Sequence, residues 1–184
     1  LSETVVIDAR EHMLGRLSSV VAKELLNGKR IVVTHCEQIA IAGSFYRNKT
    51  KYMEYFQKRF AYNPSRGQFH FRDPANILRK TIRRMVPNKT ARGKEAMTRL
   101  QTFAGVPEKY STRHVVVPEA IRQLRLKSTR DFCLLGDIAA EIGWKNKDAT
   151  EVFDKKWMEA DEARRAKYNE AYEKACQNKE VAKL

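Results

Sequence analysis

The residues with the most evident chemistry are a run of cations between positions 79 and 99. Eight arginines and lysines there accompany a single carboxylate, Glu95. They are Arg79, Lys80, Arg83, Arg84, Lys89, Arg92, Lys94 and Arg99. A guanidinium can bind a phosphate through two parallel hydrogen bonds or stack on a base, and lysine supplies a point charge. The run therefore predicts contact with the phosphates of a nucleic acid.

Two shorter groups of cations precede this run. One comprises Arg47, Lys49 and Lys51, where only Glu54 is close enough in sequence to pair with a cation. The other comprises Arg66, His70 and Arg72. In an extended segment, Phe69 and Phe71 would point away from His70 and Arg72, so we expect both phenyl rings in the core. We predict RNA binding for the cations of both groups and for His70.

The positive charge is confined to the middle of the chain. Residues 44–130 hold 21 basic and five acidic side chains, whereas residues 1–43 hold five of each and residues 131–184 hold ten basic and 12 acidic. An ordinary solvated surface mixes both signs, and a segment this basic repels itself unless a polyanion offsets the charge. No apolar run approaches the roughly 20 residues that a membrane-spanning helix needs. We therefore expect a nucleic-acid partner and no membrane.

Residues for catalysis or metal binding form no recognisable pattern. The four histidines are scattered, and the metal-ligand, phosphate-loop and dinucleotide motifs are missing. Asp8 and His12 could act as an acid–base pair, but no nucleophile accompanies them. Cys36, Cys133 and Cys176 are too far apart to indicate a disulfide framework, which favours a reducing compartment. We predict no catalytic residue, metal, cofactor or small-molecule substrate.

The first elements predict a parallel α/β fold. A short apolar run at 4–8, apolar residues spaced by three and four over 14–25, and a second apolar run at 30–36 read as strand, helix and strand. Such a βαβ unit makes its two strands parallel. Gly28 suits the position just after the helix, and residues 39–42 predict a third short strand.

Further helices carry the cations. One starts after Ser44, and its expected apolar side consists of Tyr52, Tyr55, Phe56 and Phe60. Asp73 and Pro74 are typical of a helix start, and that helix should turn Leu78, Ile82 and Met85 inward. The next should run from about 92 to 104, with Met97, Leu100 and Phe103 inward. Residues 115–117 suit a strand, and residues 135–142 a short helix closed by Gly143.

The last segment predicts one long helix from Lys147 to Lys183. It contains neither proline nor glycine, and its apolar stripe is thin among charges of both signs. We therefore divide the chain into an α/β RNA-binding domain, residues 1–146, and an extended C-terminal helix, residues 147–184. We expect this helix to dock on a neighbouring protein or RNA rather than on its own domain.

Several motifs in order resemble the universal large-subunit ribosomal protein thirteen family, in its eukaryotic cytosolic form. They are IDA at 7–9, HMLGRLSS at 12–19, FYRNK at 45–49, NPSRG at 63–67, FHFR at 69–72, MVPNKT at 85–90, RG at 92–93, LG at 135–136 and GWK at 143–145. The sequence departs from the family pattern in three places. Glu11 and Arg84 stand where a glycine is usual, and Asn88 stands where a histidine is usual.

The resemblance implies a three-layer α/β/α fold with a small, mainly parallel sheet. It also implies a structural, non-enzymatic component of the large ribosomal subunit that organises ribosomal RNA and contacts neighbouring ribosomal proteins. Such a protein would work on cytoplasmic ribosomes and assemble in the nucleolus. From the charge alone, a DNA-binding or chromatin protein is the first alternative, and an RNA-modifying enzyme is a weaker one. No helix-turn-helix, zinc-finger or basic-zipper pattern supports the first.

Overall fold

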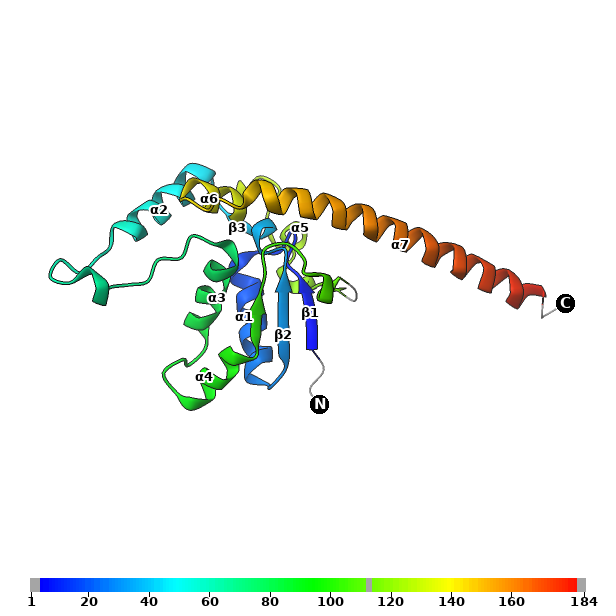
Figure 1. Cartoon of the computed structure of the whole chain (residues 1–184), viewed down its shortest axis with the longest axis horizontal. Coiled ribbons are helices and arrows are strands. Elements are labelled where there is room, and N and C mark those ends of the chain that lie inside the picture. Colours follow the sequence, from blue (N-terminus) through cyan, green and yellow to red (C-terminus); the bar gives the residue numbers. More distant parts are fainter. Residues whose placement is uncertain (1–3, 112–113, 182–184) are drawn as a thin grey trace.

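The computed structural model describes residues 4–111 and 114–181, with side chains described as far as residue 174. Its strands are β1 (Thr4–Asp8), β2 (Arg30–Thr34), β3 (Ala40–Ala42), β4 (Leu100–Thr102), β5 (His114–Val115) and β6 (Phe132–Leu134). Its helices are α1 (Leu14–Leu26), α2 (Phe45–Gln57), α3 (Pro74–Met85), α4 (Ala91–Thr98), α5 (Arg122–Arg125), α6 (Leu135–Glu141) and α7 (Lys147–Val181). Figure 1 shows α2 leaving the domain on one side and α7 on the other.

The main sheet has the order β4-β2-β1-β5, and every pairing in it is parallel. The predicted βαβ unit is β1, α1 and β2, and the predicted α/β class with a mainly parallel sheet is confirmed. Leu17, Val21 and Leu25 recur at three- and four-residue spacing, so they lie on the buried side of α1. Gly28 follows with a φ of +94°, a left-handed conformation that favours glycine and ends the helix.

The predicted helix over 92–104 is wrong in its second half. α4 ends at Thr98, and residues 100–102 form β4, which pairs in parallel with residues 31–33 of β2. Leu100 is buried as predicted, but it is buried from a strand. Without β4, the backbone groups along that side of β2 would lack partners. The spacing of apolar residues around Leu100 does not indicate that β2 needs a neighbouring strand there.

The two faces of the sheet are covered differently. The core contains Leu17 and Leu25 from α1 and Leu78 and Ile82 from α3, packed with alternate residues of β1 and β2. On the other face, Val6, Val32 and Gln101 share one register row, and the Tyr110 hydroxyl donates a hydrogen bond to the Gln101 side chain at 3.0 Å. That face is therefore covered in part by the 3-10 turn at Glu108–Tyr110.

Met85, at the end of α3, was predicted to lie inward but is exposed. Val86 is buried instead, because the helix ends at Met85 and the extended backbone of Val86 turns its side chain into the core. The predicted helix start is confirmed, since the Asp73 carboxylate accepts the backbone N–H of Asn76 at 3.1 Å.

A second, two-stranded sheet anchors α2. β3 pairs antiparallel with β6, and α6 follows β6 directly. Asn48 is the buried residue of α2, and its side-chain amide donates to the carbonyls of Ala42 and Gly43 at 3.3 and 3.2 Å. Beyond this anchor α2 leaves the domain and ends at Gln57, so Phe60 lies outside the helix and is exposed, contrary to prediction.

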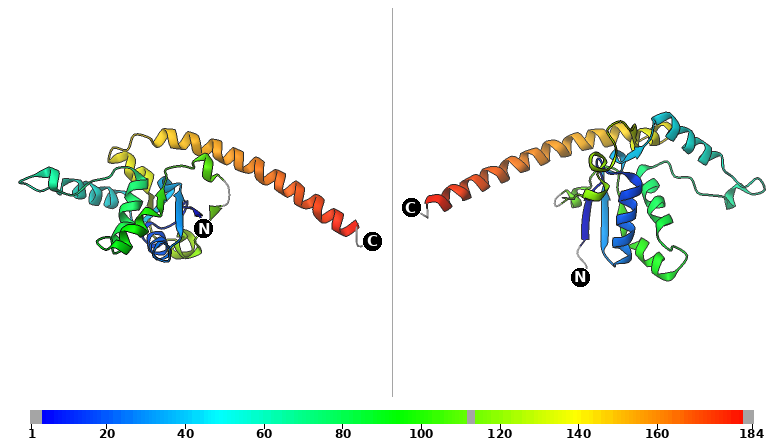
Figure 2. Two further views of the ribbon diagram at one scale, coloured as in Figure 1. Left: turned by 60° about the horizontal axis from the view of Figure 1, so that its bottom comes forward. Right: turned by 180° about the vertical axis from the view of Figure 1, so that it is seen from behind.

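The long C-terminal helix is α7, which is described as far as Val181; the predicted end at Lys183 lies outside the described residues. Its 35 residues span about 52 Å. The expectation that it avoids its own domain is wrong for its early turns. Asp154 is buried and accepts a hydrogen bond from the Gln38 amide at 2.8 Å, and the Trp157 ring packs on His35 at 5.0 Å. Both views of Figure 2 show the later part projecting away from the domain.

Candidate nucleic-acid interface

The segment from α2 to the start of α3, residues 45–72, forms a projecting arm (Figure 1). The irregular segment that returns from the end of α2 toward α3, residues 58–72, is held to α2 by side chains. The Tyr55 hydroxyl donates to the carbonyl of Phe69 at 3.1 Å, and His70 Nε2 donates to the carbonyl of Lys58 at 3.1 Å. The His70 ring also packs on Tyr55 and Phe56, with centroid distances of 4.5 and 5.3 Å. His70, predicted to meet RNA, therefore holds the arm together.

Several aromatic rings of the arm lie in solvent. Phe69 is 76% exposed and Phe71 is 40% exposed, so the prediction that both belong to the core is wrong. The arm has no core beneath it, so the alternation over 69–72 does not lead to burial of the two phenyl rings. Phe60 and Tyr62 are exposed as well, Tyr62 at 98%. Aromatic groups beside cations on one surface are typical of sites that bind unpaired nucleic-acid strands.

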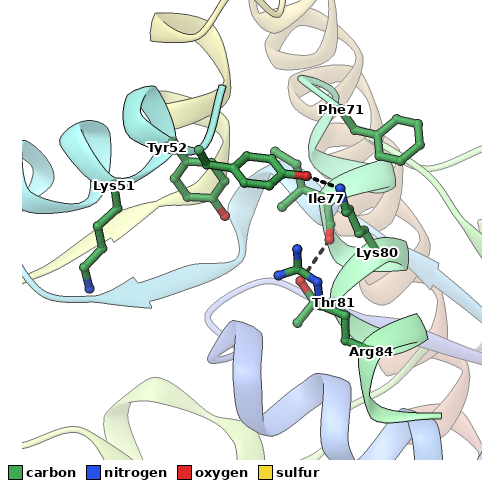
Figure 3. Close-up of a pocket in the computed structure, with 8 residues that line it drawn as sticks. Lys51, Tyr52, Phe71, Ile77, Lys80, Thr81 and Arg84 are labelled. Carbon is green, nitrogen blue, oxygen red and sulfur yellow. Dashed lines mark hydrogen bonds between the residues drawn. The ribbon is translucent and has the colours of Figure 1, made fainter. Parts of the chain in front are cut away.

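Helix α3 presents a row of cations beside the arm. Arg79, Arg83 and Arg84 are exposed, whereas Lys80 is half-buried. Lys80 Nζ donates to the Phe69 carbonyl at 2.5 Å and also to the Tyr55 hydroxyl. Figure 3 shows Lys80 and Arg84 on α3 with Phe71 nearby, and Tyr52 and Lys51 of α2 across the hollow. The buried stripe of α3 thus directs its arginines outward, as predicted.

The turn between α3 and α4 is built by three polar contacts. The Asn88 amide donates to the Arg83 carbonyl at 3.1 Å, so Asn88 caps the end of α3. The Thr90 hydroxyl donates to the Pro87 carbonyl at 2.8 Å and accepts the N–H of Gly93 at 3.3 Å. Gly93 is required, because a Cβ there would lie 2.0 Å from the Pro87 oxygen. Three exposed cations decorate this turn and α4, namely Lys89, Arg92 and Lys94.

Several predicted RNA-binding cations already have partners within the chain. Lys49 pairs with Glu141 at 2.6 Å, whereas the sequence offered only Glu54 as a nearby acid for this group of cations. Glu141 lies 92 positions away, so local spacing could not reveal the pair. Arg99 pairs with Glu95 at 2.8 Å and donates to the Leu25 carbonyl at 3.0 Å. The guanidinium of Arg72 lies 5.6 Å from the centre of the Phe56 ring.

Ten predicted cations are exposed and make no ion pair with any residue that the structure describes. They are Arg47, Lys51, Arg66, Arg72, Arg79, Arg83, Arg84, Lys89, Arg92 and Lys94. Lys58 and Arg59 are two further exposed cations that were not predicted. They line a hollow of about 480 Å³ together with Arg72. The sequence could have indicated Lys58 and Arg59, because they lie inside the basic stretch.

A buried polar cluster lies at the carboxyl ends of β1 and β2. The Asp8 carboxylate contacts His35 Nδ1 at 3.1 Å and Arg10 at 2.6 Å. Although burial opposes ionisation, hydrogen bonds from His35 and Arg10 hold the pKa of Asp8 below its usual range. The ring nitrogens of His12 bond instead to the backbone, Nδ1 to the Arg10 carbonyl and Nε2 to the Val117 N–H. The Asp8–His12 pair considered from the sequence is therefore not formed, and the cluster joins strands and α7.

Other classes of site were also sought among residues 4–111 and 114–181. No cluster of three or more histidine, cysteine, aspartate or glutamate side chains there could hold a metal ion. No helix in that part of the chain has the length and apolar character to span a membrane. Cys36 and Cys133 are free and buried, and burial raises the pKa of both thiols, which disfavours the reactive thiolate.

Comparison with known proteins gives consistent matches. The model of the family described as ribosomal protein L13 matches residues 2–109. The large ribosomal subunit protein uL13 of Spodoptera frugiperda is 49% identical over 156 residues, which cover 84% of this chain and 76% of the relative. The protein of the same name from Drosophila melanogaster is 48% identical over 156 residues, with the same shares. The match thus reaches well beyond the basic stretch.

Proposed function

Because the chain belongs to the ribosomal protein L13 family, we propose that it is a structural component of the large ribosomal subunit that binds and organises ribosomal RNA through its basic surface. The basic surface is the set of ten exposed cations without an ion pair on the arm, α3, the following turn and α4. The proposal of RNA binding rests on this arrangement of exposed cations. Cations without carboxylate partners keep their charge available for phosphates.

The mechanism follows from the spread of these cations over several elements. Phosphates of adjacent RNA helices repel one another. Arginines and lysines held between the helices offset the free-energy cost of that repulsion. The grooves of A-form RNA offer little sequence information, so recognition rests on backbone shape, 2′-hydroxyls and irregular loops. The protein acts in this scheme as a scaffold, without a catalytic residue or cofactor.

The rest of the proposed role concerns partners and place. The protein works in cytoplasmic ribosomes after joining the RNA during assembly in the nucleolus. The exposed part of α7 contacts neighbouring ribosomal proteins or RNA. Its balanced charge and projection beyond the domain support a role in docking.

The test measures binding of the full chain to large-subunit ribosomal RNA at a series of salt concentrations. The triple variant Arg79→Gln, Arg83→Gln and Arg84→Gln should bind more weakly. The slope of log affinity against log salt should fall by about three, roughly one for each lost phosphate contact. The matched control replaces Arg16, Lys23 and Arg30, which are exposed on α1 and at the start of β2, by glutamine, and this removes equal charge outside the basic surface.

Two results would contradict the proposal. One is wild-type affinity that does not change with salt, and the other is an equal loss of affinity in the control variant. Sedimentation of a native lysate separates the chromatin alternative. The protein should travel with large subunits after DNase treatment, whereas a chromatin protein would be released.

A further inference from the structure

A groove runs between residues 67–71 of the arm and helix α3. It consists of two hollows of about 230 and 540 Å³ that share Phe71, Lys80 and Arg84 as lining residues. Figure 3 shows the residues that line the smaller hollow, and two of them, Phe71 and Lys80, also line the larger one. Pockets for nucleotide-sized ligands commonly measure about 300–1,000 Å³, so the larger hollow has a suitable size. We call the two hollows the α3 groove.

The walls of the α3 groove combine aromatic rings with cations. Phe69 and Phe71 stand on the arm side, and Arg79 and Arg83 stand on α3. None of the residues that line either hollow is a carboxylate. The exposed amide of Gln68 adds a hydrogen-bond donor and an acceptor beside the rings. These are the chemical groups that recognise the flat face, the polar edge and the phosphate of one nucleotide.

The aromatic wall is held in place by hydrogen bonds to its backbone. The Phe69 carbonyl accepts from Lys80 Nζ at 2.5 Å and from the Tyr55 hydroxyl at 3.1 Å. The backbone beneath the ring is thus fixed while the ring itself remains 76% exposed. A ligand that stacks on the Phe69 ring loses less free energy to ordering the arm, because the backbone of the arm is already fixed before binding.

The same features favour an unpaired nucleotide over other occupants. Double-helical RNA presents phosphates and 2′-hydroxyls, which the arginines could bind but which do not cover an exposed phenyl ring. An apolar protein segment would cover the rings but would bury cations without partners, at high cost. A base stacks on the ring while its phosphates neutralise the arginines, so one ligand satisfies both walls.

We propose that the α3 groove holds an unpaired nucleotide of the bound RNA, with its base stacked on Phe69 and its phosphates on Arg79 and Arg83. This assignment rests on the proposed function and names the RNA feature that the basic surface recognises. It also gives the exposed rings of the arm a role in positioning RNA that the cations alone do not provide.

The experiment is chemical footprinting of base accessibility and backbone accessibility on ribosomal RNA extracted from large subunits. Wild-type protein should protect an unpaired base, and Phe69→Ala should restore its reactivity while leaving the backbone protections. Loss of one stacking contact should weaken overall binding by roughly 5- to 150-fold. Phe69→Trp should keep the base protection, because it keeps a stacking surface. The matched control is Tyr62→Ala, since Tyr62 is an aromatic residue of the same arm that is even more exposed than Phe69 but lines neither hollow.

Failure of the groove assignment and failure of the proposed function would give different results. Identical base protections with wild type and Phe69→Ala would overturn the groove assignment while leaving the proposed function intact. A wild-type protein that leaves no footprint on this RNA would count against the proposed function itself. A photoreactive phenylalanine analogue at position 69 should crosslink to RNA in assembled subunits, and a crosslink to protein alone would assign the groove to a protein neighbour.

Discussion

At the scale of single residues, Glu37 is a buried carboxyl group near the join between the domain and α7. Its Oε2 accepts the Gly105 N–H at 2.9 Å, and its Oε1 has no hydrogen-bond partner among the described residues. Burial raises the pKa of Glu37 to about 7. Because this folded-state pKa exceeds the usual 4.5, the group stabilises the fold fully below pH 4.5 and loses that contribution as pH rises through 7.

We therefore predict that Glu37→Gln flattens part of the pH dependence of stability. A glutamine keeps an oxygen for the Gly105 N–H and does not titrate. The free energy of unfolding, measured with urea at pH 5, 6, 7 and 8, should fall more steeply in wild type. The difference in slope should be at most about 1.4 kcal/mol per pH unit.

Two neighbouring groups titrate in other ways. Burial lowers the pKa of His114, so its contribution rises with pH and partly offsets that of Glu37. Asp8, whose pKa is lowered, loses its contribution only as pH falls below its usual 3.8. The difference between wild type and Glu37→Gln isolates Glu37, and parallel profiles would show that this carboxyl is not responsible.

At the scale of elements, the turn between α3 and α4 depends on Gly93. The variant Gly93→Ala would place a methyl group 2.0 Å from the Pro87 oxygen, so the backbone must move. We expect a loss of about 1–3 kcal/mol in the free energy of unfolding, the range for an overpacked site. RNA affinity should also fall, because Lys89 and Arg92 would shift with the turn. Urea unfolding and the salt-titrated binding assay measure both effects.

The matched control lies in α1. A Cβ at Gly15 would meet no atom within 4 Å, and Gly15→Ala should stabilise the helix by roughly 0.5–1 kcal/mol. If both alanine variants behaved alike, close approach at the turn would not be the reason for Gly93.

At the scale of the whole molecule, α7 has an anchored part and a projecting part. Its anchor comprises Asp154, Trp157 and Arg164, whose guanidinium donates to the Ser111 carbonyl at 2.7 Å. We predict that removing residues 168–184 leaves the melting temperature within about 2 °C of wild type, because Tyr168 and Tyr172 are exposed. The same truncation should reduce incorporation into large subunits, measured by sedimentation of tagged protein.

Removing all of α7 from residue 147 should instead lower the melting temperature, since His35 and Gln38 lose their partners. Trp157→Ala tests the anchor alone. It should cost about 2 kcal/mol, less than the 3–5 kcal/mol of a fully buried ring because Trp157 is partly exposed. A full deletion as stable as wild type would show that the anchor adds nothing to the domain.

The sequence by itself determined features that depend on near neighbours along the chain. Apolar spacing and the cap at Asp73 defined β1, α1, β2 and the start of α3, and the count of charges located the basic stretch. The ordered motifs indicated the family, which the comparisons confirm. Each of these signals lies within a few consecutive residues, where periodicity and composition carry the information.

Only the tertiary structure decided features that depend on distant partners. Leu100 lies in a strand because that strand pairs with β2, which is far away in sequence and would otherwise have no neighbouring strand on that side. Lys49 forms an ion pair with an acid on α6, and Asp154 accepts a hydrogen bond from Gln38 of the domain. Phe69 lies in solvent because the arm projects from the core and has nothing to bury the ring. An alternating pattern shows which side chains share a face, but only the packed chain shows whether that face meets core or solvent.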